Sequence, residues 1–391
     1  SPRLIRLQLD SIASELSWDG LFASATPYEL LSATVYARRD NASAQAELTP
    51  WQLSIPALSL HSNDLQLDAS LQLGNELSIL ARLQQLDAAR AAQYFPQRYM
   101  PQRTREYLTQ AIRAGSLTDA TMLWHGKPAD FPYREQQGVF QVLAKLQHGQ
   151  FSFAPGWPDI TELNTELWFE NAAMQIQSVG GKLGDIELEQ GVTAQIADLF
   201  DAKALDIRIQ QQVDASALTA LMLQSPLQAT LGKTLQHLGA EGSVSGDVSL
   251  DIGLRQPGVA AKGTVQFADN RLTLQAPALQ LEQINGRLNF HNEHIWAEQL
   301  QLAWRGVPMT AALQGEQLPQ GYQLALQLAG QQQVKPLLQT VYAPAADLVA
   351  GSADWQLKLA LNLPQSGFNY QAELQSDLQQ AALLLPAPYN K

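Results

Sequence analysis

Residues 357–363 read LKLALNL, and this alternation of apolar side chains with polar or small ones decides the fold of the chain. The same pattern occurs at residues 248–254 (VSLDIGL) and 324–328 (LALQL). Successive side chains of a β-strand point to opposite faces of the sheet, so each run predicts a short strand with one apolar and one polar face. Such runs recur along nearly the whole sequence and predict roughly twenty strands, paired as antiparallel neighbours.

The size of the chain constrains how these strands are arranged. The sequence has 391 residues, of which 46% are hydrophobic and 16% are charged. Single hydrophobic cores stop growing near ~250–300 residues, so the chain forms either two domains or an elongated body. No Pro/Gly/Ser-rich linker separates two halves. We therefore expect a mainly β fold with short α-helices, in which an elongated, curled antiparallel sheet forms a hydrophobic groove built from loosely repeated modules.

Composition and motifs exclude several classes of function. The net charge of −12 argues against nucleic acid as a partner, because phosphate binding needs a basic patch. The absence of cysteine excludes disulfides, thiolate metal sites and cysteine nucleophiles. No Walker A motif, nucleophile elbow or dinucleotide-binding fingerprint is present, and residues 242–246 (GSVSG) have valine where the elbow needs serine. We expect no enzymatic activity and no cofactor.

A candidate metal site has an ordinary explanation. His291 and His294 are three residues apart, which on a helix would place them on one face. The segment lies between apolar strand runs, so we expect a solvated hairpin turn and no metal. Glu187 and Glu189 are similarly expected to lie on the exposed face of a strand.

Short helical segments interrupt the strands. Apolar residues at helical spacing, with proline at a start or glycine after an end, mark these segments. The helices are expected at residues 86–95, 101–114, 215–224, 225–238 and 334–341. No run of ~18 apolar residues is present, and the chain opens on Ser1, so we expect it to be a segment of a longer protein.

Two registers indicate an internal repeat. Residues 163–171 and 284–292 share Asn, Leu, Phe and Asn at the same four positions, with an offset of 121. Three helices are followed by glycine and then by a strand, at Gly115, Gly242 and Gly351. Coincidence in alternating sequence is the alternative explanation. The modules are expected as an N-terminal β segment at 1–95, a first helix-plus-β module at 96–224, a second at 225–333 and a truncated third at 334–391.

Turn residues fall between the strand runs. Asn-Gly and similar dipeptides favour the tight turns of β-hairpins. Turns are expected at Asp269-Asn270, Asn285-Gly286, Asn292-Glu293 and Gln320-Gly321.

The aromatic residues allow three interpretations. Phe131, Tyr133 and Trp157 lie near prolines, while Trp168 and Phe169 are adjacent and must point to opposite faces of a strand. Such residues could pack a core, line or rim an apolar channel, or stack on sugars. We favour core packing and retain the other two.

An apolar sheet face this large needs a cover, and a few short helices cannot supply it. A curled sheet would enclose an apolar slot whose natural ligand is an acyl chain. At ~0.8 kcal/mol per buried CH₂, a sixteen-carbon chain gains about 13 kcal/mol from such shelter. The residues expected to contact acyl chains lie at period two on the strands and share one face of the sheet. They are Phe151, Phe153, Leu167, Phe169, Val248, Leu250, Ile252, Val265, Phe267, Leu272, Leu274, Leu288, Phe290, Leu300, Leu302, Leu324, Leu326, Leu357 and Leu359.

One region is specific enough to name a family. Its motifs include Tyr94-Phe95-Pro96, Met100-Pro101, residues 130–133 (DFPY) and Trp157-Pro158, and further likeness extends to Leu385-Pro386 and Lys391. On these motifs the chain resembles the YhdP family of AsmA-like and TamB-like bridge-type lipid transfer proteins of the Gram-negative envelope. The likeness covers most of residues 50–391.

The resemblance implies a large periplasmic protein held in the inner membrane by one N-terminal helix, which this sequence lacks. It implies phospholipid transport toward the outer membrane through a hydrophobic β-groove, with outer-membrane or periplasmic proteins as possible partners. It supplies no catalytic residues. The alternatives are a periplasmic scaffold that assists outer-membrane assembly with a core filled by its own side chains, and a carbohydrate-active β enzyme, which the absence of a convincing acid pair disfavours.

Overall fold

The computed structural model describes eleven segments that together make up most of the chain. They are 3–16, 25–39, 51–63, 65–94, 102–189, 191–229, 238–256, 258–275, 278–341, 343–363 and 369–385. Their strands form a 22-stranded antiparallel sheet. The chain divides into two compact units, one of Ser1–Ile209 with Leu250–Val259 and the other of Gln210–Ser249 with Ala260–Lys391.

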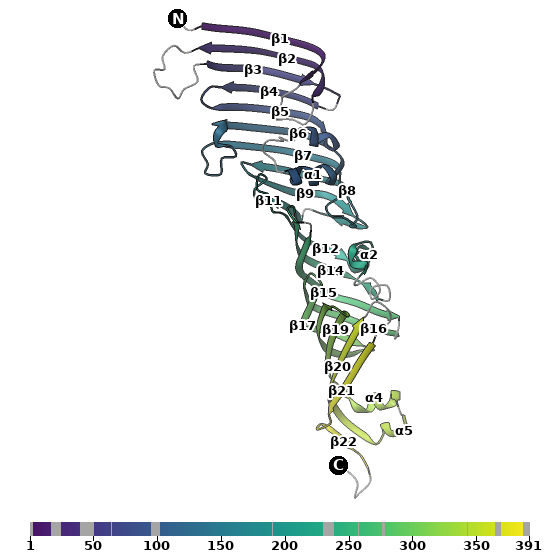
Figure 1. The fold of residues 1–391 in the computed structure, drawn as a ribbon. Helices are drawn as coiled ribbons and strands as arrows, with labels where there is room; N and C mark the ends of the chain where they lie inside the picture. Colours follow the sequence, from purple (N-terminus) through teal and green to yellow (C-terminus); the bar gives the residue numbers. More distant parts are fainter. Residues whose placement is uncertain are drawn as a thin grey trace. The chain divides into compact units, whose positions relative to one another are not determined.

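In the first unit, strands follow one another along the chain and pair with their neighbours in sequence (Figure 1). The strands are β1 (Arg3–Leu16), β2 (Thr26–Arg39), β3 (Trp51–His61), β4 (Leu65–Leu73), β5 (Leu77–Asp87), β6 (Ile112–Gly126), β7 (Val139–Phe151), β8 (Ile160–Glu170), β9 (Ala173–Leu183), β10 (Ile186–Leu188) and β11 (Val192–Ile196). Strand β12 (Ala204–Asp214) begins in this unit and pairs with β11, which itself pairs with β9.

The helices of the first unit lie between β5 and β7. They are the 3₁₀ segment η1 (Ala88–Tyr94), the α-helix α1 (Gln102–Ala111) and the 3₁₀ turn η2 (Pro128–Asp130). The helices predicted at 86–95 and 101–114 are therefore present and shorter than predicted. Residues 95–101 lie outside the described part of the chain.

The second unit repeats this meander (Figure 1). Its strands are β13 (Leu238–Glu241), β14 (Ser243–Gly253), β15 (Val259–Gln275), β16 (Ala278–His291), β17 (His294–Trp304), β18 (Val307–Leu318), β19 (Gly321–Gln333), β20 (Val349–Leu363), β21 (Asn369–Asp377) and β22 (Ala381–Leu383). The end of β14, from Leu250 onward, and the first residue of β15, Val259, belong to the first unit. Its helical segments are α2 (Ala215–Leu223), η3 (Pro226–Ala229), α4 (Val334–Val341) and α5 (Ala343–Ala346). The helices predicted at 215–224 and 334–341 are confirmed, and most of the helix predicted at 225–238 lies outside the described residues.

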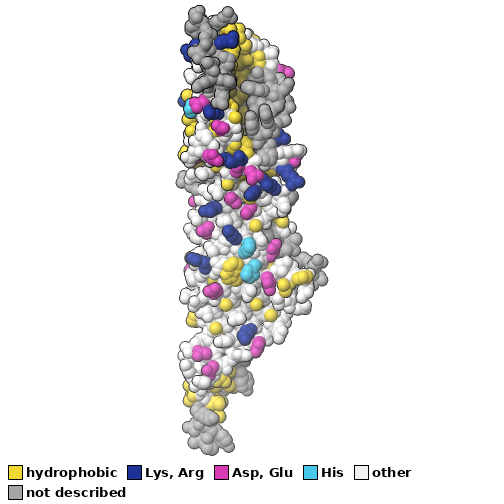
Figure 2. All heavy atoms as spheres, turned by 60° about the vertical axis from the view of Figure 1, so that its left-hand side comes forward, with side chains coloured by type: hydrophobic (Ala, Val, Ile, Leu, Met, Phe, Trp, Pro, Cys, Tyr) yellow, Lys and Arg dark blue, Asp and Glu magenta, His cyan; other side chains and the backbone are white. Residues whose placement is uncertain are grey.

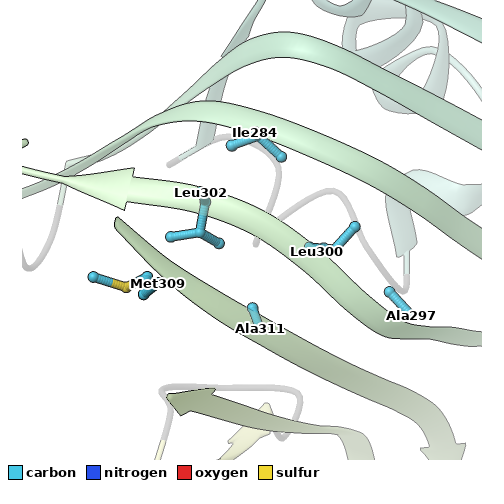
Figure 3. Packing of buried hydrophobic residues seen from close by; sticks show 6 residues of the cluster. All are labelled: Ile284, Ala297, Leu300, Leu302, Met309 and Ala311. Atoms are coloured by element: carbon cyan, nitrogen blue, oxygen red, sulfur yellow. The ribbon is translucent and has the colours of Figure 1, made fainter. Parts of the chain in front are cut away.

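Each unit keeps one apolar face. On β4, Leu67 and Leu71 alternate with Asp68 and Gln72, and antiparallel pairing places Leu67 opposite Leu60 of β3. In the second unit, six buried residues come from the neighbouring strands β16, β17 and β18 (Figure 3). These residues are Ile284, Ala297, Leu300, Leu302, Met309 and Ala311. The mainly β, antiparallel class predicted from the alternation is confirmed.

Two of the predicted turns are wrong. Asp269-Asn270 lies inside β15 and Asn285-Gly286 lies inside β16, where the pairing register shifts. Asp269 (φ 58°) and Gly286 (φ 130°) adopt left-handed backbone conformations. Turn-forming residues also suit β-bulges, which need the same backbone conformations. The strands therefore continue through these positions and are longer than the alternating runs predict. The turn at Asn292-Glu293 is confirmed, and the turn predicted at Gln320-Gly321 is present and ends at Gly321, the first residue of β19.

Among the described residues, no helix combines the length and apolar character needed to cross a membrane.

Candidate functional site

The apolar face of the first unit contains two of the predicted contact residues side by side. On β8, Leu167 lies opposite Ala144 of β7 and Ile176 of β9. Phe169 lies two residues along the same strand, opposite Met174 of β9, which is 6% exposed. The side chains of Leu167 and Phe169 are themselves only partly buried. They contribute to a continuous apolar surface across β7, β8 and β9.

Helix α1 packs an aromatic group beside this face. The Tyr107 ring meets the Phe151 ring edge-on, with 6.4 Å between centroids, and the Tyr107 hydroxyl donates a hydrogen bond to the Phe153 carbonyl at 3.0 Å. Phe153 itself is 2% exposed and contacts the ring of Trp157. Burial raises the pKa of Tyr107 well above its ordinary value, so this hydroxyl stays protonated. Phe151 and Phe153 thus belong to a packed aromatic group.

A second aromatic group packs at the other end of β6. The loop at residues 127–138 stacks Phe131 on Trp124 with 4.6 Å between ring centroids, and the Phe140 ring lies edge-on at 5.4 Å. The Trp124 indole N–H donates to the Tyr133 hydroxyl at 2.7 Å, and the Tyr133 side chain is fully buried. An ion pair between Arg134 and Asp198 at 2.8 Å holds the loop from outside.

These two groups flank the apolar surface. Helix α1 immediately precedes β6 and the loop immediately follows it, so they lie at opposite ends of that strand. In contrast, the apolar side chains of β1 are open to solvent, with Ile5 and Leu7 each 53% exposed. Figure 2 shows hydrophobic side chains in view at the level of these N-terminal strands, while charged groups of both signs are interspersed over the rest of that face. The apolar surface of the first unit is therefore flanked at strand ends and uncovered at β1.

The second unit orders its apolar side chains in rows across the strands. Leu326 of β19 lies between Leu313 of β18 and Leu359 of β20. The next row places Leu328 opposite Leu357. These leucines are all partly buried, whereas their neighbours along the strand, such as Gln327 and Lys358, are exposed. Alternation thus places the apolar residues on a single surface, and their side chains are partly exposed to solvent.

A close approach of two backbones joins β14 to this surface. A Cβ atom added to Gly263 of β15 would clash with the Asp247 carbonyl and come 2.9 Å from Val248 Cα and 3.1 Å from the Phe290 ring. Glycine at this position therefore allows Val248 and Phe290, both predicted contact residues, to lie close together. Val265, on the same strand, lies opposite Leu288.

The predicted contact residues differ in how accessible they are. Leu300 and Leu302 are 8% and 6% exposed and pack within the cluster of Figure 3, and Ile252 is 4% exposed. Phe267, Leu272, Leu288 and Leu326 pack against that cluster and remain partly exposed. Leu250 and Leu324 are also partly buried, and the side chain of Leu274 lies outside the described residues.

The histidine pair lies where the sequence predicts. His291 and His294 are cross-strand partners that flank the turn between β16 and β17, and the His294 ring stacks on Trp296 with 4.9 Å between centroids. Within the described parts of the chain, no group of three or more His, Cys, Asp or Glu side chains is arranged to hold a metal ion.

Sequence reasoning did not assign the flanking groups. The segment Phe131-Pro132-Tyr133 was visible as an aromatic motif, but its packing against Trp124 depends on a hairpin whose register the alternation does not fix. The only feature of the sequence that indicates a packed loop is the pair of aromatic residues Phe131 and Tyr133 beside Pro128 and Pro132.

Comparison with known proteins identifies the family of the chain. The family model described as "YhdP protein" matches residues 1–391. The intermembrane phospholipid transporter YhdP of Escherichia coli (strain K12) is 32% identical over 317 residues, which cover 81% of this chain. The match covers 25% of the relative, so the chain spans about a quarter of that protein's length. No solved structure matches the chain.

Proposed function

The chain is a member of the YhdP protein family, and on that premise we propose that it is a segment of a periplasmic, bridge-like carrier. The carrier moves phospholipid between the inner and outer membranes, with the acyl chains lying on the apolar face of its sheets. The E. coli relative is named an intermembrane phospholipid transporter, which supports lipid as the cargo.

One structural observation carries the proposal. In both units, apolar side chains continue from strand to strand on one face and remain partly exposed, as the row of Leu313, Leu326 and Leu359 illustrates. Leaving such area in water costs roughly 25 cal/mol per Å², and an acyl chain laid on it would recover that free energy. Extended apolar surface of this kind marks a binding surface in a folded protein.

Membership of the family supports a proposal for the role of the whole protein. We propose that an N-terminal helix outside this chain anchors the carrier in the inner membrane and that the body of the carrier lies in the periplasm. We propose further that periplasmic or outer-membrane proteins bind the end of the carrier that is far from the inner membrane. It acts by sheltering lipid, without catalysis, cofactor or metal. Phe151, Phe153, Leu300 and Leu302 serve as packing, and the partly exposed members of the predicted set contact the lipid.

We also propose that the carrier grows by repeated modules, at residues 96–224, 225–333 and from 334 onward, after an N-terminal β segment at 1–95. The left-handed glycines support this division, because Gly115 (φ 133°) and Gly351 (φ 96°) follow helices α1 and α5 within a few residues, and Gly242 (φ 93°) separates the strands β13 and β14. A modular sheet can be lengthened until it spans the distance between two membranes.

Photo-crosslinking tests lipid contact at the level of one strand. A photoreactive phenylalanine analogue replaces either Leu326, on the apolar face, or its neighbour Gln327, on the polar face. The chain is then incubated with vesicles of phosphatidylethanolamine and phosphatidylglycerol, irradiated and analysed by mass spectrometry. We expect a lipid adduct at position 326 and none at position 327.

The outcomes distinguish transport from the scaffold alternative. Equal labelling at both positions would mean non-specific adsorption, and no labelling at either, in chains that melt like the unmodified protein, would favour a self-filled scaffold. Native mass spectrometry of the unmodified chain gives an independent measure, since a carrier is expected to retain phospholipid through purification.

A further inference from the structure

A polar pocket lies on the face of the first unit opposite the apolar surface. It has a volume of about 310 Å³, near the lower limit of the roughly 300–1,000 Å³ typical of small-molecule sites. Two rows of side chains on β8, β9, β11 and β12 form it. The first row is Trp168, Gln175, Gln195 and Asp206, and the second is Glu166, Gln177, Thr193 and Arg208, with each residue opposite the next across the sheet.

Trp168 is the unusual member of this face. Its side chain is 56% exposed, although Leu167 and Phe169 on either side of it face the apolar surface. A tryptophan left this open on a polar surface presents a flat apolar ring with an electron-rich face. The ring has the exposed Leu143 of β7 on one side and Gln175 of β9 on the other, so a ligand stacked on it would reach the polar groups of Gln175 and Gln195 on the pocket side.

The polar side chains of the pocket are free to bind a ligand. Within the part of the chain that the structure describes, Glu166, Gln175, Gln177, Gln195, Asp206 and Arg208 have no recorded side-chain hydrogen bond or ion pair. Elsewhere on the polar sides of the strands, cross-strand neighbours bond to each other. Ser59 donates to Asp68 at 2.6 Å, and Gln210 donates to Asp247 at 3.1 Å.

The charges of the site select against several ligands. Glu166 and Asp206 are balanced by Arg208 and by Lys145, which lies opposite Glu166 on β7. A balanced site gives little attraction to phosphate or to a polycation, and its charged and amide side chains, which lie beside the Trp168 ring, do not suit an acyl chain. Three amides, two carboxylates and a guanidinium supply both donors and acceptors, which matches hydroxyl groups that do both.

We propose that this pocket binds a neutral saccharide, with one face of a sugar ring stacked on Trp168 and its hydroxyls hydrogen-bonded to Gln175, Gln195 and Asp206. The C–H groups on the face of a pyranose are weakly positive and meet the negative face of the indole ring. The binding role is separate from lipid transfer, because the site uses the opposite face of the sheet. A periplasmic carrier with such a pocket would dock on glycan strands as it passes them.

Binding of defined oligosaccharides tests the proposal. Chitotetraose and maltotetraose are titrated into the chain, with saturation-transfer NMR and tryptophan fluorescence as readouts. We expect at least one of the two to bind. Trp168→Ala should raise its Kd at least tenfold, equivalent to about 1.4 kcal/mol, and Gln195→Ala should weaken binding while leaving the indole ring in place.

Trp304→Ala is the matched control, since Trp304 is also exposed (40%) but lies on β17 of the other unit. It should leave binding unchanged. Each variant is first shown to have the melting temperature of the parent chain. Absence of binding by both sugars, equal binding by the Trp168→Ala variant, or a Trp168-dependent association with phosphatidylglycerol vesicles in place of sugar would each overturn the proposal.

Discussion

Asn164 of β8 and Asn285 of β16, 121 residues apart in sequence, make the same two hydrogen bonds. The Asn164 side-chain oxygen accepts from the His148 backbone N–H at 3.3 Å, and its amide donates to the Glu162 carbonyl at 3.0 Å. Asn285 accepts from the Asp269 N–H at 3.0 Å and donates to the Gln283 carbonyl at 2.8 Å.

The backbone around the two asparagines matches as well. His148, Glu162, Asp269 and Gln283 all adopt left-handed conformations, with φ between 50° and 58°. A conformation that is rare for such residues needs support from its surroundings. Each asparagine supplies this support by binding both left-handed positions at once, so it fixes a bulge at the same place in two different strands.

Replacing either asparagine should therefore destabilise its own bulge. Asn164→Ala and Asn285→Ala each remove two hydrogen bonds, and at about 0.5–1.5 kcal/mol for each bond the loss of stability should be roughly 1–3 kcal/mol. Urea unfolding followed by circular dichroism measures the change. Asn289→Ala is the control, because the structure records no side-chain hydrogen bond for Asn289 among the described residues. Equal losses in all three variants would contradict a bulge-specific role.

These bulges mark the limit of what the sequence could predict. Alternation in residues 324–328 and 357–363 predicts strands, faces and an antiparallel meander, because side-chain direction in a strand depends only on position. The dipeptides Asp269-Asn270 and Asn285-Gly286 predict turns for the correct physical reason, namely tolerance of left-handed φ. Whether such residues end a strand or bulge it depends on the partner strand, which local sequence does not specify.

The candidate contact residues show the same division. Their common apolar character was readable from period two, and the register places some of them in shared rows, such as Leu326 with Leu359. The sequence did not predict how far each of these side chains is exposed to solvent. Leu302 is buried by Met309, which lies opposite it on β18, whereas Leu326 faces other leucines and stays partly exposed. That difference comes from packing between strands.

Tyr322 should make stability fall at high pH. Its hydroxyl donates to the Glu293 carbonyl at 2.9 Å, and burial, followed by the nearby Glu293 and Glu316 carboxylates, raises its pKa from 10.0 to about 12. Between these values the unfolded chain loses a proton that the folded chain keeps, so its stabilising effect is complete below pH 10 and is lost as the pH rises toward 12. The loss is on the order of 2 kcal/mol.

The comparison with Tyr322→Phe isolates this effect. The variant loses one hydrogen bond, at a cost of about 1 kcal/mol near neutral pH, and should show a shallower decline between pH 10 and 12. Tyr107 and Tyr133, whose pKa values are also raised, are present in both proteins. Parallel stability curves for the two proteins over this range would contradict the assignment.

Gly263 should not tolerate a side chain. Because a Cβ atom there would clash with the Asp247 carbonyl and approach Val248 Cα at 2.9 Å, Gly263→Ala must push two strands apart. Overpacking of this kind typically costs ~1–3 kcal/mol. Gly258→Ala is the control, because nothing lies within 4 Å of a Cβ atom at that position. If thermal melting showed the two variants to be equally stable, the close approach of Val248 and Phe290 would be wrong.

The aromatic loop should hold one end of β6 in place. Phe131 contacts Trp124, Phe140 and Phe200, with ring centroids 4.6–5.4 Å apart. Phe131→Ala should cost ~2–4 kcal/mol, slightly less than the truncation of a fully buried phenylalanine. The same truncation at the exposed Leu378 (62%) should change stability by less than about 0.5 kcal/mol. If Phe131→Ala left the stability unchanged, the loop at residues 127–138 would not stabilise this end of β6.

Two neighbouring positions on β14 separate a lipid-contact surface from a packed core. Leu250 is partly buried, whereas Ile252, two residues further along the same face, is 4% exposed. An unpaired carboxylate at a buried site costs several kcal/mol, while one that keeps water costs far less. Leu250→Asp should therefore melt within a few degrees of the parent chain, and Ile252→Asp should melt much lower or fail to fold.

Lipid retention decides between the two interpretations of this surface. If acyl chains lie across Leu250, the folded Leu250→Asp variant should carry less phospholipid in native mass spectrometry, because a carboxylate would stand in the apolar path. Leu250→Ala, which keeps the surface apolar, should retain it. A Leu250→Asp variant that unfolds as readily as Ile252→Asp would place Leu250 in a core filled by the protein's own side chains. If the variant folded and carried as much phospholipid as the parent chain, acyl chains would not lie across β14.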